Sequence, residues 1–175
     1  QLDGKTYPYL AVTMKDDFPG IFITRSPSDS EFKGAKLFGP FTSSGALNRS
    51  IHMLQSVYKF RTCPLDIRED NPANKYFRPC LLHAINRCSA PCANKITKES
   101  YREDIDGFLR FLTSKRSVML RELRTRMERA SINKEYEEAA EIRNQINALI
   151  KLDDRAPKDV EWQSEVMIFA QDPSK

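Results

Sequence analysis

The sequence contains no apolar run approaching the roughly 20 residues that cross a bilayer. Its first residues, Gln1 to Thr6, are polar and do not resemble a signal peptide. It also lacks a glycine-rich phosphate loop, an HExxH metal motif and a GxSxG nucleophile motif. We therefore expect no membrane partner, and we identify no candidate catalytic residue.

Cysteine is absent from both ends of the chain and is confined to its middle. The spacing is Cys-x16-Cys-x7-Cys-x3-Cys, and the four residues are Cys63, Cys80, Cys88 and Cys92. Four soft thiolates in one short segment are typical of a closed metal or iron–sulfur site. Two disulfides in a secreted protein are the alternative, but disulfide-rich domains are usually smaller and spread their bridges over the whole fold. A reducing cytoplasm and a bound metal fit the pattern better.

The spacing also bears on which metal binds. Zinc sites usually use two CxxC pairs, and this chain has none. Iron–sulfur clusters are larger than one ion and tolerate wider spacing, so we favour a cluster, with zinc as the alternative. Four structural thiols without metal are a third interpretation. His52 and His83 are not needed as ligands, and each is more often a surface or core residue.

Positive charge is concentrated around the cysteines. Residues 33–98 carry eleven basic and three acidic side chains, a net charge of +8, whereas residues 1–32 and 99–175 each carry a net −2. Such a block is a plausible footprint for a polyanion, although an ordinary solvated surface also explains it. The candidate DNA-binding residues are Lys36, Arg49, Lys59, Arg61, Arg78 and Arg87.

Aromatic residues are interleaved with these basic residues. They could stack on unpaired bases, but at strand and helix positions most are expected in the core. The set comprises Phe38, Phe41, Tyr58, Phe60, Tyr76 and Phe77.

The apolar pattern predicts an α+β fold in three parts. Short segments at 7–14, 20–24 and 36–41 predict three strands, and an apolar stripe from Leu47 to Tyr58 predicts a helix, so residues 1–60 form a small α+β unit. Residues 61–96 have no sustained period and several prolines, which indicates an irregular module held by its metal.

Residues 97–152 are predicted to be helical, beginning with a stripe at Tyr101, Ile105, Phe108 and Leu112. Two later stripes, separated by a polar break at 131–134, predict an antiparallel helical hairpin at about 115–150. Residues 153–175 are predicted to be a linker or the start of another domain, with a possible strand at 165–170.

Three stretches together resemble one family. They are Lys5–Leu10, the region from Phe38-Gly39-Pro40-Phe41 through Phe60-Arg61-Thr62-Cys63 to Cys80–Cys92, and Leu123–Leu149. They are similar to the UvrC subunit of the bacterial UvrABC nucleotide excision repair nuclease. The first stretch resembles the segment that follows the family's GIY-YIG nuclease domain. The second resembles its cysteine block, and the third resembles its UVR motif. Tyr136 and Asn144 depart from the motif, which usually has Phe and Asp there.

The resemblance implies a function for each part. It implies that the four cysteines hold a [4Fe–4S] cluster and that the hairpin binds UvrB, bringing the nuclease to damaged DNA. The complete protein would incise DNA on both sides of a lesion, using its GIY-YIG and RNase H-like domains. Since most of the first domain and all of the second are missing from this sequence, we expect no cutting by this chain. The residues implied at the UvrB interface are Met127, Ala130, Tyr136, Ala139, Ala140, Arg143 and Ile146.

A zinc-bearing regulatory adaptor is the alternative function. UVR hairpins also resemble segments of activators of protein arginine kinases and of Clp-type chaperones. The cysteines of those proteins come as CxxC pairs, so the absence of CxxC here argues against an adaptor.

Overall fold

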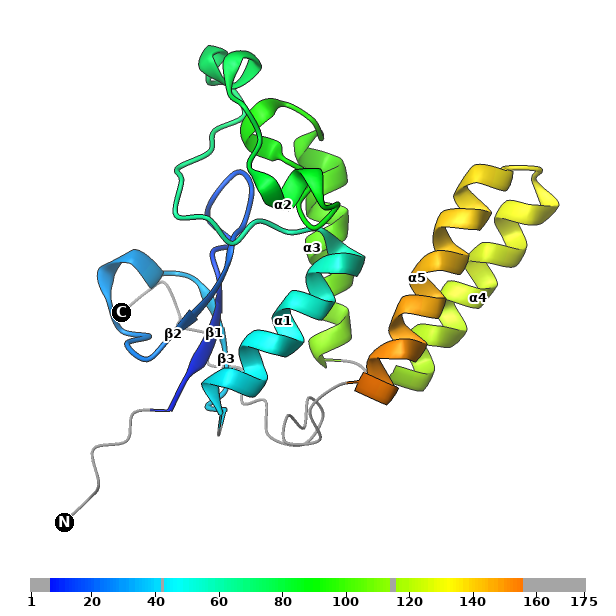
Figure 1. Cartoon of the computed structure of the whole chain (residues 1–175), viewed down its shortest axis with the longest axis horizontal. Helices are drawn as coiled ribbons and strands as arrows, with labels where there is room; N and C mark the ends of the chain where they lie inside the picture. The colour runs from blue at the N-terminus through cyan, green and yellow to red at the C-terminus, as the bar shows by residue number, and fades with distance from the viewer. Residues whose placement is uncertain (1–6, 42, 114–115, 156–175) are drawn as a thin grey trace.

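The computed structural model describes residues 7–41, 43–113 and 116–155. It has a three-stranded sheet, two helices packed against that sheet, an irregular cysteine segment at one end and a separate pair of long helices (Figure 1). The α+β fold with a C-terminal helical hairpin is therefore confirmed. The possible strand at 165–170 lies outside the described residues.

The sheet is antiparallel, with strand order β2-β1-β3. Its strands are β1 (Tyr9–Val12), β2 (Ile21–Thr24) and β3 (Lys36–Phe38), and a 3₁₀ turn, η1 (Ser30–Phe32), precedes β3. All three predicted strands are present but shorter than the apolar segments that predicted them. Leu10 pairs with Ile23 on one side and with Phe38 on the other, which places β1 at the centre of the sheet.

Helix α1 (Ser44–Tyr58) begins where Ser43 Oγ accepts a hydrogen bond from the Ala46 amide and ends at Lys59, whose φ is 50°. Helix α3 (Lys98–Thr113) buries all four residues of its predicted stripe. The two helices approach closely because Gly107 has no side chain, and a Cβ there would lie 3.1 Å from the Tyr58 ring. Although α3 falls in the predicted helical region 97–152, it packs into the same core as the sheet and α1.

The cysteine segment, residues 61–96, contains only short elements, as predicted. They are the 3₁₀ turn η2 (Pro72–Tyr76), the single-turn helix α2 (Leu81–Ala84) and the 3₁₀ turn η3 (Pro91–Ala93). Asn86, Ala90 and Asn94 all have left-handed backbone conformations; Ala90 and Asn94 flank η3, and Asn86 lies in the turn after α2. Such conformations interrupt any regular period, which explains why the segment shows none.

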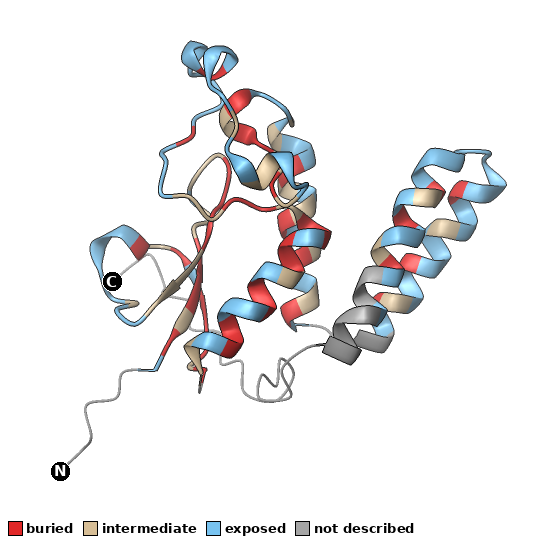
Figure 2. Ribbon diagram, viewed as in Figure 1, coloured by how far each residue is buried: buried red, intermediate tan, exposed pale blue. Residues whose placement is uncertain are grey.

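The hairpin consists of α4 (Arg116–Ile132) and α5 (Tyr136–Arg155), which pack side by side. The turn between them contains Lys134, with φ 61°. Helix α5 runs three residues past 152, the predicted end of the helical region. Figure 2 shows buried residues on the facing sides of α4 and α5 and exposed residues around the remainder.

Candidate functional site

The four cysteines all lie in the irregular segment. Cys80 is the residue before α2, Cys92 lies within η3, and Cys63 and Cys88 lie in the connecting loops. All four are free thiols: Cys88 is buried, Cys63 and Cys92 are half-buried, and Cys80 is exposed. Among the described residues, no group of three or more His, Cys, Asp or Glu side chains is close enough to hold a metal ion.

The four thiols nevertheless lie near enough to influence one another. Burial is the main cause that raises the pKa of Cys88 to about 11; the Ala90 backbone opposes it, and the charges of Cys63, Cys80 and Cys92 add to it. The pKa of Cys92 is also raised, mainly by burial and to a smaller extent by the charges of Cys63 and Cys80.

Backbone hydrogen bonds hold the loop that carries Cys88. The amides of Arg87 and Cys88 both donate to the Leu82 carbonyl, at 2.7 and 3.1 Å. His83 Nδ1 lies 2.9 Å from the Cys88 carbonyl oxygen, which links α2 to the loop. The Ser89 amide donates to the Lys59 carbonyl at 3.0 Å, which attaches the loop to the end of α1.

Arg61, predicted to contact DNA, is instead buried, with 2% of its side chain exposed. Its guanidinium donates to the carbonyl oxygens of Phe18 (2.7 Å), Cys63 (2.7 Å) and Leu65 (2.8 Å). It also donates to Asp16 Oδ2 at 3.0 Å. The prediction for Arg61 is wrong because a guanidinium enclosed by these acceptors has no surface to offer a phosphate.

Helix α3 completes the contacts around Arg61. The Tyr101 hydroxyl accepts a hydrogen bond from the Arg61 amide at 3.0 Å and donates to the Pro19 carbonyl. Arg102 donates to the Asp16 carbonyl at 2.6 Å. Arg61 and α3 therefore fix the start of the cysteine segment against the β1–β2 loop. Sequence reasoning missed this role because an arginine within a basic block looks the same in sequence whether its charge is exposed or buried.

The other five candidate DNA-binding residues are at least partly accessible. Lys36 on β3, Arg49 on α1 and Arg78 beyond η2 are exposed, and they lie on different elements. Lys59 and Arg87 are half-buried where the cysteine segment meets α1. Lys59 caps the end of α1, and Arg87 donates to the carbonyl of His52 on the same helix. His52 itself is exposed, as expected of a histidine that is not a ligand.

The aromatic residues of the basic block divide into two groups. Phe38, Phe41, Tyr58 and Phe60 are buried in the core, as the sequence led us to expect for most of them. The other two are exposed at the end of η2: Tyr76 is 78% exposed and Phe77 is 49% exposed.

The seven predicted UvrB-contact residues also divide by burial. Ala130, Ala139 and Ile146 are buried in the apolar seam of the hairpin, together with Leu123 and Ile142. In this conformation those three present little surface to a partner, so their contact with UvrB stays a prediction that would require the seam to open. Accessible residues of the set are Tyr136 and Arg143, which are exposed, and Met127 and Ala140, which are half-buried. Ile132, which belongs to the predicted polar break, is an apolar residue that is 80% exposed.

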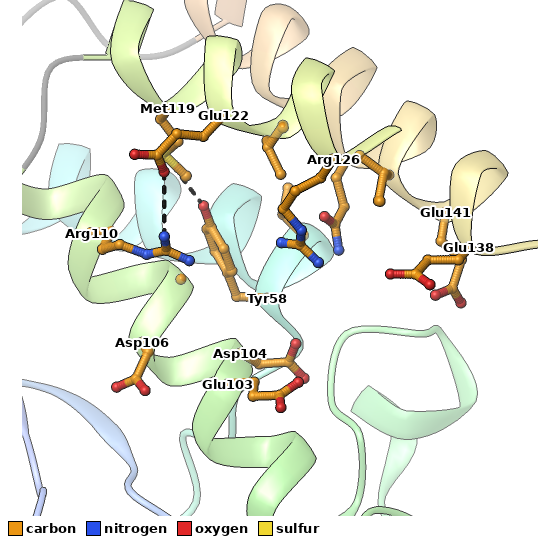
Figure 3. A pocket seen from close by; sticks show the side chains of 15 residues that line it. Tyr58, Glu103, Asp104, Asp106, Arg110, Met119, Glu122, Arg126, Glu138 and Glu141 are labelled. Atoms are coloured by element: carbon orange, nitrogen blue, oxygen red, sulfur yellow. Dashed lines mark hydrogen bonds and ion pairs between the residues drawn. The ribbon is translucent and has the colours of Figure 1, made fainter. Parts of the chain in front are cut away.

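A cleft of about 660 Å³ separates the hairpin from α1 and α3 (Figure 3). The contacts that cross it include a hydrogen bond from the Tyr58 hydroxyl to Met119 Sδ at 3.8 Å and an ion pair between Arg110 and Glu122 at 3.3 Å. Two arginines, Arg110 and Arg126, line it with a larger number of acids. The acidic residues are Glu103, Asp104, Asp106, Glu122, Glu138 and Glu141.

Asp104 is the acid of this lining whose pKa is shifted. Burial raises the pKa of Asp104 to about 6; Lys59 lowers it, and Glu103 and Glu141 raise it further. A cleft with this excess of carboxylates repels phosphates, so DNA is not expected to enter it. In the sequence these acids are indistinguishable from those of a solvated helix face. They line one cleft only because tertiary packing places α3 opposite α5.

Comparisons with known proteins match the two parts separately. The family described as "UvrC/Cho excinuclease, middle domain" matches residues 7–111, which end within α3. The family described as "UvrB/uvrC motif" matches residues 117–152, the helical hairpin. The middle-domain match includes α3, in agreement with its packing in the sheet core.

Curated relatives named "UvrABC system protein C" match most of the chain. The one from Moorella thermoacetica is 40% identical over 84% of this chain and 23% of its own length. The one from Nitrosomonas eutropha is 42% identical with the same two coverages, and the one from Corynebacterium jeikeium is 40% identical over 85% and 21%. The chain thus spans about a quarter of the length of these relatives.

No solved structure matches the chain. Within the described residues, no helix is long and apolar enough to span a membrane.

Proposed function

The chain belongs to the UvrC family, and we propose that it forms the part of an excision-repair nuclease that carries an iron–sulfur cluster, binds DNA and docks UvrB. The observation that carries this proposal is the position of the cysteines. Four free thiols lie in the most basic part of the chain, inside the stretch that matches the UvrC middle domain and ahead of the UVR hairpin. The zinc-bearing adaptor is disfavoured, because the middle-domain match covers residues 7–111.

The donor set matches an iron–sulfur cluster in the number and element of its ligands, although in this conformation the described side chains are not close enough together to hold a metal ion. Cys63, Cys80, Cys88 and Cys92 supply four sulfur ligands, the number that a [4Fe–4S] cluster takes. When bound, the cluster would cross-link the two ends of a segment that has little regular structure. Its formation would also require the buried Cys88 thiol to lose its proton, since the thiolate is the form that binds metal.

The protein's own residues prepare this site from one side. Arg61 fixes the carbonyl oxygens of Cys63 and Leu65, which orients the chain around the first ligand. Hydrogen bonds to the Leu82 carbonyl orient the loop around Cys88. We propose a structural role for the cluster, because these contacts position backbone rather than a reacting group.

DNA binding would rest on the accessible cations. Lys36, Arg49 and Arg78 are exposed, and phosphate contacts from such residues give affinity without sequence readout. Lys59 and Arg87 would contribute less, since both are half-buried.

UvrB docking would use the outer surface of the hairpin. Tyr136, Arg143 and Ala140 lie on α5 and are exposed or half-buried, so a partner helix pair can reach them without opening the seam. The half-buried Met127 on α4 is the remaining member of this surface.

The metal content tests the cluster assignment directly. We expect protein purified without oxygen to contain iron and sulfide and to absorb broadly in the visible range. Replacing all four cysteines with serine should abolish both signals. Stoichiometric zinc without iron would refute the cluster and revive the zinc-bearing adaptor.

A salt titration tests DNA binding. Affinity should fall steeply with salt and depend little on sequence, and Arg78→Ala should reduce the salt slope by about one unit. The matched control is Arg124→Ala, which removes an equally exposed arginine from the hairpin. A flat salt response, or equal effects of the two variants, would contradict the assignment.

Capture by UvrB tests the hairpin. Ala140→Glu places a charge on the accessible surface and should abolish capture while leaving the iron content unchanged. Ile146→Glu is not suitable, because it would disrupt the hairpin itself. Unchanged capture by Ala140→Glu, with Arg124→Glu as the control, would reject this docking surface.

A further inference from the structure

The middle of the cysteine segment exposes four large apolar side chains within ten residues of chain. Tyr76 and Phe77 are 78% and 49% exposed, and Leu81 and Ile85 are 72% and 53% exposed. Figure 2 shows the region around η2 as mostly exposed and projecting beyond the sheet and helices. Clustered exposed apolar side chains are uncommon on monomeric proteins and often mark an interaction surface.

The two aromatic residues sit on an ordered turn. Asn71 Oδ1 accepts from the Ala73 amide at 3.0 Å, and the Phe77 amide donates to the Asn74 carbonyl at 3.1 Å. Asn74 is buried, and its side-chain amide donates to the Arg68 carbonyl at 2.7 Å. The rings are therefore displayed by a turn that is held from inside, so binding would not have to order them first.

The charge around the rings favours nucleic acid over protein as the occupant. Residues 71–98 include five basic side chains and no acidic one. Lys75 Nζ lies 4.8 Å from the centre of the Tyr76 ring, and the exposed Arg78 follows Phe77 directly. Aromatic rings beside cations are the combination that binds unpaired nucleotides, because the rings stack on bases while the cations contact phosphates.

We propose that Tyr76 and Phe77 stack on unpaired bases of DNA, with Lys75 and Arg78 on the adjacent phosphates. This inference rests on the DNA-binding part of the proposed function and adds its substrate class, DNA that contains unpaired bases. In an intact duplex both faces of each base are covered by its neighbours, so the rings find no partner there. The four other aromatic residues of the basic block cannot take this role, since they are buried.

The test compares two DNA substrates with the iron-loaded protein. One is a labelled duplex, and the other is the same duplex with a central run of mismatched bases. Tyr76→Ala combined with Phe77→Ala should weaken binding to the mismatched DNA by about tenfold or more and leave duplex binding within about twofold. Tyr7→Ala is the matched control, because Tyr7 is an exposed tyrosine (51%) outside this region.

A second measurement reports on stacking itself. Tyr76→Trp should keep full affinity for the mismatched DNA, and its added fluorescence should be quenched by that DNA but not by the duplex. Iron content and circular dichroism should be unchanged in every variant, because the replaced side chains are exposed.

Three results would overturn the inference. One is an equal loss of affinity for both DNA substrates, and another is no loss for either. The third is lost capture of UvrB with unchanged DNA binding, which would make the patch a protein-docking surface.

If Lys75→Ala with Arg78→Ala weakens binding to both substrates while the aromatic variant has no effect, DNA binding stands and only the stacking role fails. If the unaltered protein binds neither DNA, the DNA-binding proposal fails as well.

Discussion

The cysteine segment and the helical hairpin both lie outside the sheet, and they are held in opposite ways. The hairpin is held by an apolar seam whose described members recur at helical spacing and include Leu123, Ala130, Ala139, Ile142 and Ile146. The beginning of the cysteine segment is held mainly by one buried guanidinium and its acceptors.

This difference determines how each region responds to mutation. A seam shares the stabilisation among several similar contacts, so each residue contributes a part. In the cysteine segment the stabilisation depends on a single buried cation. Removal of the Arg61 guanidinium leaves a carboxylate and three carbonyl oxygens without their donor. We therefore expect the largest effect in the region that looks least regular.

Arg61→Met should have the largest effect on stability of any single substitution in the two regions. Arg61 is buried although its partner Asp16 is 42% exposed, so the main loss is that of the donor to three backbone carbonyl oxygens, at about 1–3 kcal/mol for each buried acceptor left unsatisfied. Urea denaturation of the metal-free protein measures the loss. Iron incorporation should fall as well, because the chain around Cys63 loses its anchor.

Two controls accompany the Arg61 variant. Asp16→Asn should cost about 1 kcal/mol or less, because the Asp16 side chain is 42% exposed and water can replace its partner. Arg61→Lys keeps the charge but not the planar set of donors, so its stability should be intermediate. If Arg61→Met were no less stable than Asp16→Asn, the guanidinium would not be the anchor.

Ile146→Ala should have the next largest effect. Ile146 is 6% exposed within the seam, and truncation of a buried isoleucine to alanine typically costs about 2–5 kcal/mol. We expect the lower end, since the rest of the seam remains in place. Arg143→Ala, three residues earlier on α5 and exposed, should change stability by no more than about 0.5 kcal/mol. Loss of α-helical circular dichroism with urea distinguishes the two variants, and similar midpoints would argue against a seam that shares the stabilisation.

The same contrast explains what could be predicted from sequence. Every helical stripe with a clear period is present in the structure, including Tyr101 to Leu112 on α3 and the two stripes of the hairpin. Apolar residues at helical spacing indicate which face of a helix is buried, because the pattern recurs over several turns. It does not record what lies opposite, so the sequence alone cannot tell that Ala130, Ala139 and Ile146 form an inner seam rather than a docking surface.

Arg61 shows the complementary limit. Sequence reasoning treats arginine as a surface cation, since an unpaired charge is rarely buried. Its acceptors come from residues 16, 18, 63 and 65, and the contacts to 16 and 18 exist only after the β1–β2 loop packs against the cysteine segment. Tyr76 shows the same limit: the helical stripe from Leu47 marks Tyr58 as buried, but Tyr76 lies in a segment without a period, and nothing local indicates that it is exposed.

The cleft between the core and the hairpin offers a smaller, pH-dependent effect. The pKa of Asp104 is raised to about 6 by burial, against the effect of Lys59 and with that of Glu103 and Glu141. A protein loses stability as pH rises from about 4 to 6 when one of its carboxyls holds its proton more tightly in the folded state. Asp104→Asn should therefore be more stable than the unaltered protein at pH 7, by about 1–2 kcal/mol after allowance for partial exposure.

The difference between the Asp104 variant and the unaltered protein should close as pH falls through 6 toward 4. Urea denaturation of both proteins at pH 4.5 and pH 7 isolates Asp104 from the other acids that titrate in this range. A constant difference across pH would show that the carboxyl does not change its ionisation on folding.

The smallest effect is expected at the ion pair that joins the core to the hairpin. Arg110 on α3 and Glu122 on α4 lie 3.3 Å apart but are 59% and 53% exposed, whereas the Arg61 side chain is 2% exposed. Exposed pairs contribute about 0–1 kcal/mol and are screened by salt, so Glu122→Gln should reduce stability by less than about 1 kcal/mol at low salt and by nothing measurable at high salt. Since Glu122 also lies in an acidic cleft, its neutralisation relieves repulsion from neighbouring carboxylates, which reduces the net loss further. A loss as large as that of Arg61→Met would mean that the hairpin, like the cysteine segment, depends on a single polar contact.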